Sequence, residues 1–243
     1  YNTALGTNVL GANTTASYNT AIGNAALYVN TTGTTNTALG YQALTANTTA
    51  DNNTAVGNQS LGSNTTGAQN IAIGGRSLYT NTTTNNNTAV GYDALYTNAA
   101  SNNTAVGRDA LRLNTTGTLH VSVGAFSLDA NTTGGSNTAL GYESMSANTT
   151  GSHNTAVGTY ALATSSGGAN ANTAVGYGAM YATTTGGNNV GVGNSALVSN
   201  TTGDGNVAVG KEALKANTTG SNSIAIGLNA LQAQTTGGPN IAI

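Results

Sequence analysis

The sequence predicts an all-β protein, a parallel β-solenoid (β-roll) of about fourteen coils of 17 residues each. A five-residue segment, exemplified by Asn36-Thr37-Ala38-Leu39-Gly40, recurs throughout the chain, and twelve of the fourteen steps between copies are 17 residues long. Aliphatic residues also fall at the same places in every copy. Self-similarity at a short fixed period indicates stacked repeats. The copies begin at Asn2, Asn19, Asn36, Asn53, Asn70, Asn87, Asn103, His120, Asn137, Asn154, Asn172, Asn189, Asn206, Ser223 and Asn240.

The five-residue segment is typical of a β-strand. Its second and fourth residues project to one face, and its first, third and fifth project to the other. The second residue is Thr in nine copies and Val or Ile in six, while the fourth is always Leu, Ile or Val, and these residues favour strands. The third is Ala except at Ser122 and Gly191, which predicts close approach of another backbone. Either face could be the inner one.

Two further positions are fixed in each unit. The first fourteen copies end in Gly, as at Gly40, which predicts a positive φ or a lack of room for Cβ. Four residues later comes Leu, replaced by Met only at Met145 and Met180. We expect this part of the unit to form a short second strand or extended segment that contributes one large apolar side chain per coil.

A polar stretch such as Asn47-Thr48-Thr49 follows the Leu, and its residues are typical of turns. This stretch also takes up the two irregular steps, since Leu95 to Asn103 spans eight residues, Leu162 to Asn172 spans ten, and the other units span nine. Variable length predicts a loop outside the stacked core.

Stacking these units would place equivalent strands about 4.8 Å apart and align identical residues in Leu/Met, Val/Leu/Ile, Ala and Asn columns. A helical repeat is disfavoured because Gly and Asn-Thr-Thr clusters leave no window of about 10 helix-forming residues. We expect one repeat domain over residues 1–243. Because both ends lie within a repeat, we interpret it as a segment of a longer fibre or filament.

The amino-acid composition limits the kinds of partner and bound group that the chain can have. Five Lys and Arg and a net charge of −2 argue against nucleic-acid binding. The lack of Cys excludes disulfides and Cys-ligated metals. No apolar run approaches the roughly 20 residues that a membrane-spanning helix needs.

Residues 206–210 (Asn-Val-Ala-Val-Gly) and 222–227 (Asn-Ser-Ile-Ala-Ile-Gly) resemble the head repeats of YadA-like trimeric autotransporter adhesins. Similar arrays occur in fibre proteins of bacteriophage tails. The resemblance implies a left-handed β-roll, three chains packed side by side, and an extracellular, cell-surface or virion location. The coils of YadA-like heads are shorter, and here the Asn-Thr-Thr-Gly loop supplies the additional residues. An apolar strand face left outside the coil also favours a homo-oligomer.

No catalytic or metal-binding constellation is evident, so we expect neither an enzyme nor a bound cofactor. His120 and His153 lie in different units and are expected at the surface. Asp93, Glu143 and Glu212, together with Asp109, share the second position after the Gly and are expected as scattered, solvated charges.

Two sets of residues are candidate surface sites. Ten Asn-Thr-Thr sequons predict either glycosylation or simple turn chemistry, and eight tyrosines next to the fixed Gly or Leu predict either sugar- or surface-binding aromatics or covers for the coil corners. The sequon residues are Asn13, Asn30, Asn47, Asn64, Asn81, Asn114, Asn131, Asn148, Asn200 and Asn217. The tyrosines are Tyr28, Tyr41, Tyr79, Tyr92, Tyr96, Tyr142, Tyr177 and Tyr181.

The function expected from these features is structural: an extracellular fibre segment that serves as the shaft or head of a surface appendage, adhesin or tail fibre. A self-polymerising filament subunit joined end to end is one alternative. A module that binds carbohydrate or a host surface through its tyrosines is another. An ice-binding solenoid also stays open, although Val and Ile interrupt the Thr column.

Overall fold

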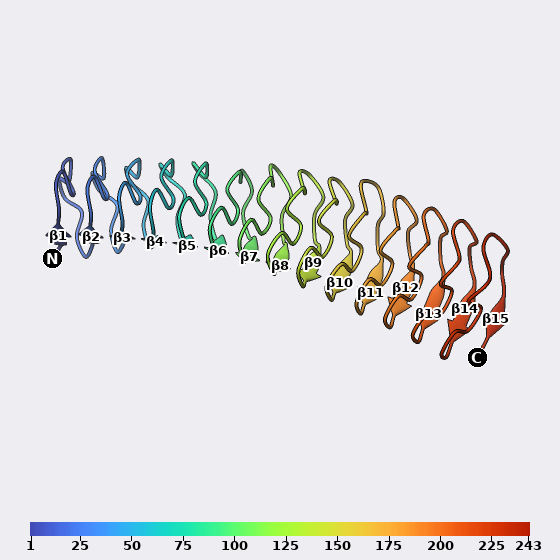
Figure 1. Ribbon diagram of the computed structural model, residues 1–243. Helices are drawn as coiled ribbons and strands as arrows, with labels where there is room; N and C mark the ends of the chain where they lie inside the picture. Colours follow the sequence, from blue (N-terminus) through green and yellow to red (C-terminus); the bar gives the residue numbers. More distant parts are fainter. The chain divides into compact units, whose positions relative to one another are not determined.

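The computed structural model describes residues 1–243 and confirms the predicted fold class, since the chain is an all-β solenoid of parallel strands without a helix (Figure 1). Each coil of about 17 residues contributes one short strand followed by turns. The chain divides into two compact units, Tyr1–Leu119 and His120–Ile243.

The first unit contains seven strands of three residues, and each pairs in parallel with the next along the chain. The strands are β1 (Thr3–Leu5), β2 (Thr20–Ile22), β3 (Thr37–Leu39), β4 (Thr54–Val56), β5 (Ile71–Ile73), β6 (Thr88–Val90) and β7 (Thr104–Val106).

The second unit contains eight strands, paired in the same parallel and sequential manner. They are β8 (Val121–Val123), β9 (Thr138–Leu140), β10 (Thr155–Val157), β11 (Thr173–Val175), β12 (Val190–Val192), β13 (Val207–Val209), β14 (Ile224–Ile226) and β15 (Ile241–Ala242).

The register aligns equivalent residues of neighbouring coils. Ala38 of β3 lies opposite Ala55 of β4, and the alignment survives the short step, where Thr88 pairs with Thr104. It also survives the long step, where Thr155 pairs with Thr173. The irregular steps are therefore absorbed outside the strands, as the sequence predicted.

The inner strand face, which the sequence left open, is the Ala face. In the coil that begins at Asn36, the side chains of Ala38, Ala43 and Leu44 are fully buried, as are those of Asn36 and Asn47. The second and fourth strand residues instead point outward and are half-buried or exposed along both units. Most coils thus enclose one large apolar side chain, small Ala side chains and two Asn.

The strand-ending Gly is required for both of the predicted reasons. Gly40 has a φ of 140°, a conformation unfavourable for other residues, and a Cβ built on it would lie 2.4 Å from the carbonyl oxygen of Gly57 in the next coil. Coils stacked this closely leave no space for a side chain there.

The prediction of a second strand around the fixed Leu is wrong. This segment is a turn in which Gln42 and Leu44 adopt left-handed conformations, with φ of 53° and 50°. The left-handed conformation costs about 1–2 kcal/mol for a residue with a side chain, whereas full burial of a Leu contributes about 1.5–3 kcal/mol. Two residues of the turn carry this strain, so the burial of Leu44 offsets most of it rather than exceeding it. The tight turn directs Leu44 into the coil.

The prediction that the polar loop lies outside the core is only partly right. Thr49 is exposed, but Asn47 and Ala50 of the same loop are buried. A buried amide is stable only when its hydrogen bonds are made, and the contacts described next meet that condition.

Candidate functional site

Two columns of Asn side chains run inside the coils. The first consists of the residues that begin each strand segment. Asn36 Oδ1 accepts the backbone N–H of Asn53 at 2.9 Å, and Asn36 Nδ2 donates to the carbonyl of Ala50 at 2.8 Å. The first bond joins two coils, and the second closes the coil across its interior.

The second column consists of the loop Asn. Asn47 Nδ2 donates to Asn30 Oδ1 at 2.9 Å and to the carbonyl of Ala50 at 3.1 Å, while Asn64 Nδ2 donates to Asn47 Oδ1 at 3.0 Å. The carbonyl of Ala50 therefore accepts hydrogen bonds from both Asn columns. These bonds explain why Asn recurs at two fixed positions of the unit.

The sequon residues are the members of this second column. Nine of the ten are buried, and Asn13 is half-buried. The Nδ2 atom that would carry a glycan donates hydrogen bonds inside the coil, as for Asn64 and Asn217. This placement favours a packing role for the sequons over glycosylation of the folded chain.

In many coils, the Thr after the loop Asn binds the next coil through its hydroxyl. The hydroxyl of Thr31 donates to the carbonyl of Thr48 at 3.0 Å, and that of Thr48 donates to the carbonyl of Thr65 at 3.1 Å. Each residue of the Asn-Thr-Thr motif is thus placed differently, since the Asn is inside, the first Thr links coils and the second faces solvent, as at Thr49.

The outward strand face is the most regular surface of each unit. Only Thr, Val, Ile and Leu occur at its two positions, and examples such as Ile71, Ile73 and Val121 are about 40% exposed. All the Lys, Arg, Asp and Glu residues of the chain lie at other positions. We call this surface the outer strand face; it is made of the second and fourth residues of each strand segment.

The candidate tyrosines lie at the surface, at the first and fifth positions after the strand-ending Gly. Tyr28, Tyr41, Tyr92, Tyr142, Tyr177 and Tyr181 are each about half exposed. Tyr79 and Tyr96, on neighbouring coils, stack with ring centroids 5.5 Å apart. The rings therefore cover the coil corner and stay partly exposed to solvent, so the structure is compatible with both interpretations.

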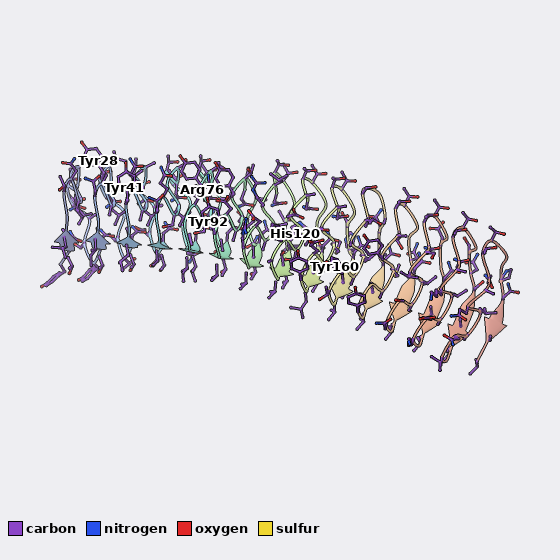
Figure 2. The ribbon with its side chains drawn as sticks, viewed as in Figure 1. Tyr28, Tyr41, Arg76, Tyr92, His120 and Tyr160 are labelled. Carbon is purple, nitrogen blue, oxygen red and sulfur yellow. The ribbon has the colours of Figure 1, made fainter.

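In the first unit, two tyrosines hold a guanidinium. The Cζ of Arg76 lies 5.0 Å from the ring centroid of Tyr92 and 5.2 Å from that of Tyr96. Arg76 and Tyr92 are labelled in Figure 2. Arg76 also forms an ion pair with Asp93, which lies between the two tyrosines in the sequence. Burial opposes the charge of Arg76, but the hydrogen bond and charge of Asp93 outweigh it and raise the pKa of the guanidinium.

In the second unit, the same positions gather aromatic rings. Tyr160, labelled in Figure 2, contacts Tyr177 and Tyr181 nearly edge-on, at centroid distances of 5.9 and 6.4 Å. It also contacts Tyr142 at 5.7 Å, and Tyr142 contacts Phe126 at 6.1 Å. Arg76, Phe126 and Tyr160 were not among the residues predicted from the sequence, although their shared position two residues after the Gly is a signal that could have identified them.

The prediction of scattered, solvated carboxylates is wrong for Asp93 and Asp109. Both are buried, and Asp109 pairs with Arg108 at 3.1 Å and with Arg112 at 3.5 Å. Glu212, which pairs with Lys215 at 3.1 Å, is half-buried. The hydrogen bond from Lys215 lowers the pKa of Glu212 despite an opposing effect of burial. Three of the four carboxylates at this position, those of Asp93, Asp109 and Glu212, therefore reach a basic side chain.

The expectation that His120 lies at the surface is also wrong, whereas His153 is exposed. His120 replaces Asn in the strand-start column: Nδ1 accepts the backbone N–H of Asn137 at 3.3 Å, and Nε2 lies 2.7 Å from the carbonyl of Gly134. Burial lowers the pKa of His120 despite these backbone hydrogen bonds. The imidazole therefore performs the structural task of an Asn amide.

No group of three or more His, Cys, Asp or Glu side chains lies close enough together to hold a metal ion. None of the chain forms a helix long and apolar enough to cross a membrane. The sequence matches no model of a protein family and no curated protein. Fold and side-chain arrangement together define the chain as a β-solenoid repeat protein.

Proposed function

We propose that this protein is a structural fibre segment whose chains associate side by side through the outer strand face. The observation that carries the proposal is the composition of that face, which presents two aliphatic or Thr side chains per coil and no charge. Contiguous exposed apolar surface marks interaction sites, and interface centres are depleted of charged residues.

A second copy of the chain is the partner that suits this surface best. The face repeats with the spacing of the coils, so another copy offers the same spacing and the same apolar chemistry. Closed symmetric assemblies are the usual outcome when identical chains associate. We propose a trimer, as in the YadA-like heads that the repeats resemble.

The interior of each coil supports a mechanical role. Backbone bonds such as Thr37 N–H to the carbonyl of Asn53, at 2.8 Å, join neighbouring coils. The Asn and Thr side-chain bonds add to them, so each coil is tied to its neighbour at several points around its circumference. This arrangement supports a stiff element of a surface appendage or tail fibre, located outside the cell or on a virion, rather than an enzyme.

Charge introduced on the outer strand face tests the proposal. Val192 and Val209 lie on neighbouring strands, point outward and are half-buried, so Val192→Lys/Val209→Lys is expected to fold but to dissociate the assembly to single chains. The matched control is Asn194→Lys, an exposed position whose equivalent in the next coil is already Lys211. Light scattering after size-exclusion chromatography measures both, and association unchanged in the double variant would contradict the proposal.

End-to-end joining is the alternative that the same preparation distinguishes. Negative-stain images that show long filaments, with the Lys variants still polymeric, would favour a self-polymerising subunit over side-by-side association.

A further inference from the structure

A groove on the turn after the strand-ending Gly is not needed for the proposed structural role. In each coil, the first and fifth residues after the strand-ending Gly flank the second residue on the same turn. We call the space between them the corner groove. In the first unit, Tyr92 and Tyr96 flank the corner groove, Asp93 occupies it, and Arg76 enters from the preceding coil.

In the coil that follows Gly176, tyrosines again flank the corner groove, but the residues within it differ. Tyr177 and Tyr181 take the places of Tyr92 and Tyr96, and Tyr160 of the preceding coil takes the place of Arg76. The residue equivalent to Asp93 is Gly178. A Cβ built on Gly178 meets no atom within 4 Å, so the space that the carboxylate fills in the first unit is open here.

The opening belongs to a hollow of about 470 Å³. Three tyrosine rings and Gly178 line it, together with Ser195 and the carboxylate-bearing Glu143. Backbone conformation does not require a Gly here, because Asp93 and Glu143 adopt φ of 55° and 50° at the same position, close to the 60° of Gly178. The lack of a side chain at residue 178 therefore creates the space.

The chemistry of the hollow suits a cation. Tyrosine faces carry negative electrostatic potential and attract guanidinium and ammonium groups within about 6 Å. The carboxylate of Glu143 adds negative charge, and no Lys or Arg lines the hollow. In the first unit, the equivalent tyrosine pair, Tyr92 and Tyr96, contacts the guanidinium of Arg76 at ring distances in this range. Tyr160 takes the place of Arg76 here, so a bound cation would lie beside Tyr160, in the space next to Gly178.

We infer that the hollow at Gly178 binds an organic cation of the guanidinium or alkylammonium class, with Tyr160, Tyr177 and Tyr181 as its aromatic walls. The cation comes either from a small molecule or from an arginine side chain of a partner protein. A neutral sugar suits the hollow less well, because the Ser195 hydroxyl already donates to Asn194 Oδ1 at 3.1 Å.

Binding is measured on the full chain with 13C-labelled tyrosine by NMR. Methylguanidinium, agmatine and the peptide Gly-Arg-Gly are the cationic probes, while urea and methyl glucoside are neutral controls. Expected are shifts confined to a few tyrosine rings with a dissociation constant on the order of 1 mM, as for a few cation–π contacts. Peptide and free cations binding alike would indicate an arginine side chain, and free cations alone a small molecule; either supports the inference.

Substitutions at residue 178 separate a cation from other ligands. Gly178→Gln fills the hollow as Gln42 and Gln59 do in their coils, where they bond to each other at 3.1 Å, and is expected to weaken binding at least about tenfold. Gly178→Asp restores the carboxylate of the first unit, which fills only part of the hollow of about 470 Å³. It is expected to tighten cation binding at least about fivefold, as an added ion pair does. Both residues occur at this position elsewhere, so the fold is retained.

Three results would overturn the inference. The first is no saturable shift with any cation at 20-fold the expected dissociation constant, or about 20 mM. The second is an equal response to urea or methyl glucoside. The third is cation binding that the Gln and Asp variants leave unchanged, which would place the ligand elsewhere.

Discussion

The side-chain amide of Asn47 donates to Oδ1 of Asn30 in the preceding coil, and these two fully buried groups lie 2.9 Å apart. Asn47 also donates to the carbonyl of Ala50 and accepts from Asn64. Each loop Asn in such a run is therefore bound on both sides, which makes the column a cooperative element of the fold.

Removing one member should be costly. Asn47→Ala would leave Asn30 Oδ1 without this donor and Asn64 Nδ2 without this acceptor inside the coil, so we expect a loss of about 3 kcal/mol in the free energy of unfolding. Urea denaturation followed by circular dichroism measures it. Thr49→Ala, in the same loop but exposed, is expected to change stability by less than about 0.5 kcal/mol. Equal effects of the two substitutions would contradict the role of the column.

Restoring the column where it is interrupted should stabilise the second unit. Ser165 and Thr183 replace the loop Asn in two successive coils, and both hydroxyls are buried without a partner, as is Oδ1 of Asn148. Ser165→Asn/Thr183→Asn would restore the column between Asn148 and Asn200, which is three bonds, and is expected to add about 3 kcal/mol, or about 1 kcal/mol per restored bond. Ser166→Asn, at an exposed neighbour, is the control. A double variant no more stable than this control would argue against the column.

The left-handed conformation of the buried Leu can be tested with substitutions that keep its volume but differ in their tolerance of a positive φ. Leu95 is fully buried with a φ of 50°, and β-branched residues are strongly disfavoured there. Leu95→Ile, which keeps the volume, is expected to cost roughly 2 kcal/mol. Leu95→Met should be nearly neutral, because Met145 and Met180 occupy equivalent sites with φ of 53° and 55°. Denaturation midpoints of the two variants give the comparison, and an Ile variant as stable as the Met variant would refute this explanation.

His120 predicts a dependence of stability on pH. Its folded-state pKa is lowered by burial, so the unfolded chain binds the proton more readily, and the stabilisation present above the unfolded value of about 6.5 is lost as pH falls toward the folded value. Protonation would place a hydrogen on Nδ1, which accepts the N–H of Asn137. We therefore expect lower urea midpoints at pH 5.5 than at pH 7.5.

The substitution His120→Asn restores the residue found in most coils and should abolish this difference, whereas His153→Gln should keep it. The interval lies above the range of Glu212, whose pKa is lowered from about 4.5. A difference that persists in His120→Asn would assign it to another group.

The fold could be predicted from the sequence because the same pattern of residues repeats along the chain. The 17-residue step fixes the coil, and the Asn-Thr-Ala-Leu-Gly segment fixes the strand and its Gly. Three features of the structure could not be predicted from the sequence. The inward position of Ala38 depends on which face leaves room for Leu44, the left-handed Leu contradicts local preference, and the buried loop Asn reads as an ordinary turn former until the coils are stacked.

The candidate sites were harder to predict for the same reason. The sequence places Tyr92 and Tyr96 at recurrent positions, but the contact of both rings with Arg76 arises only when one coil is set on the next. Gly178 is likewise an unremarked residue in the sequence, and only comparison with Asp93 on the equivalent turn reveals the space beside it.

The mass of the native particle shows whether chains of this protein associate side by side. Sedimentation equilibrium across a range of concentrations, with negative-stain images of the same sample, gives that mass. The proposal predicts a discrete particle of three chains of 23.8 kDa. A particle of a single chain at every concentration would contradict it, because the outer strand face would then remain in water.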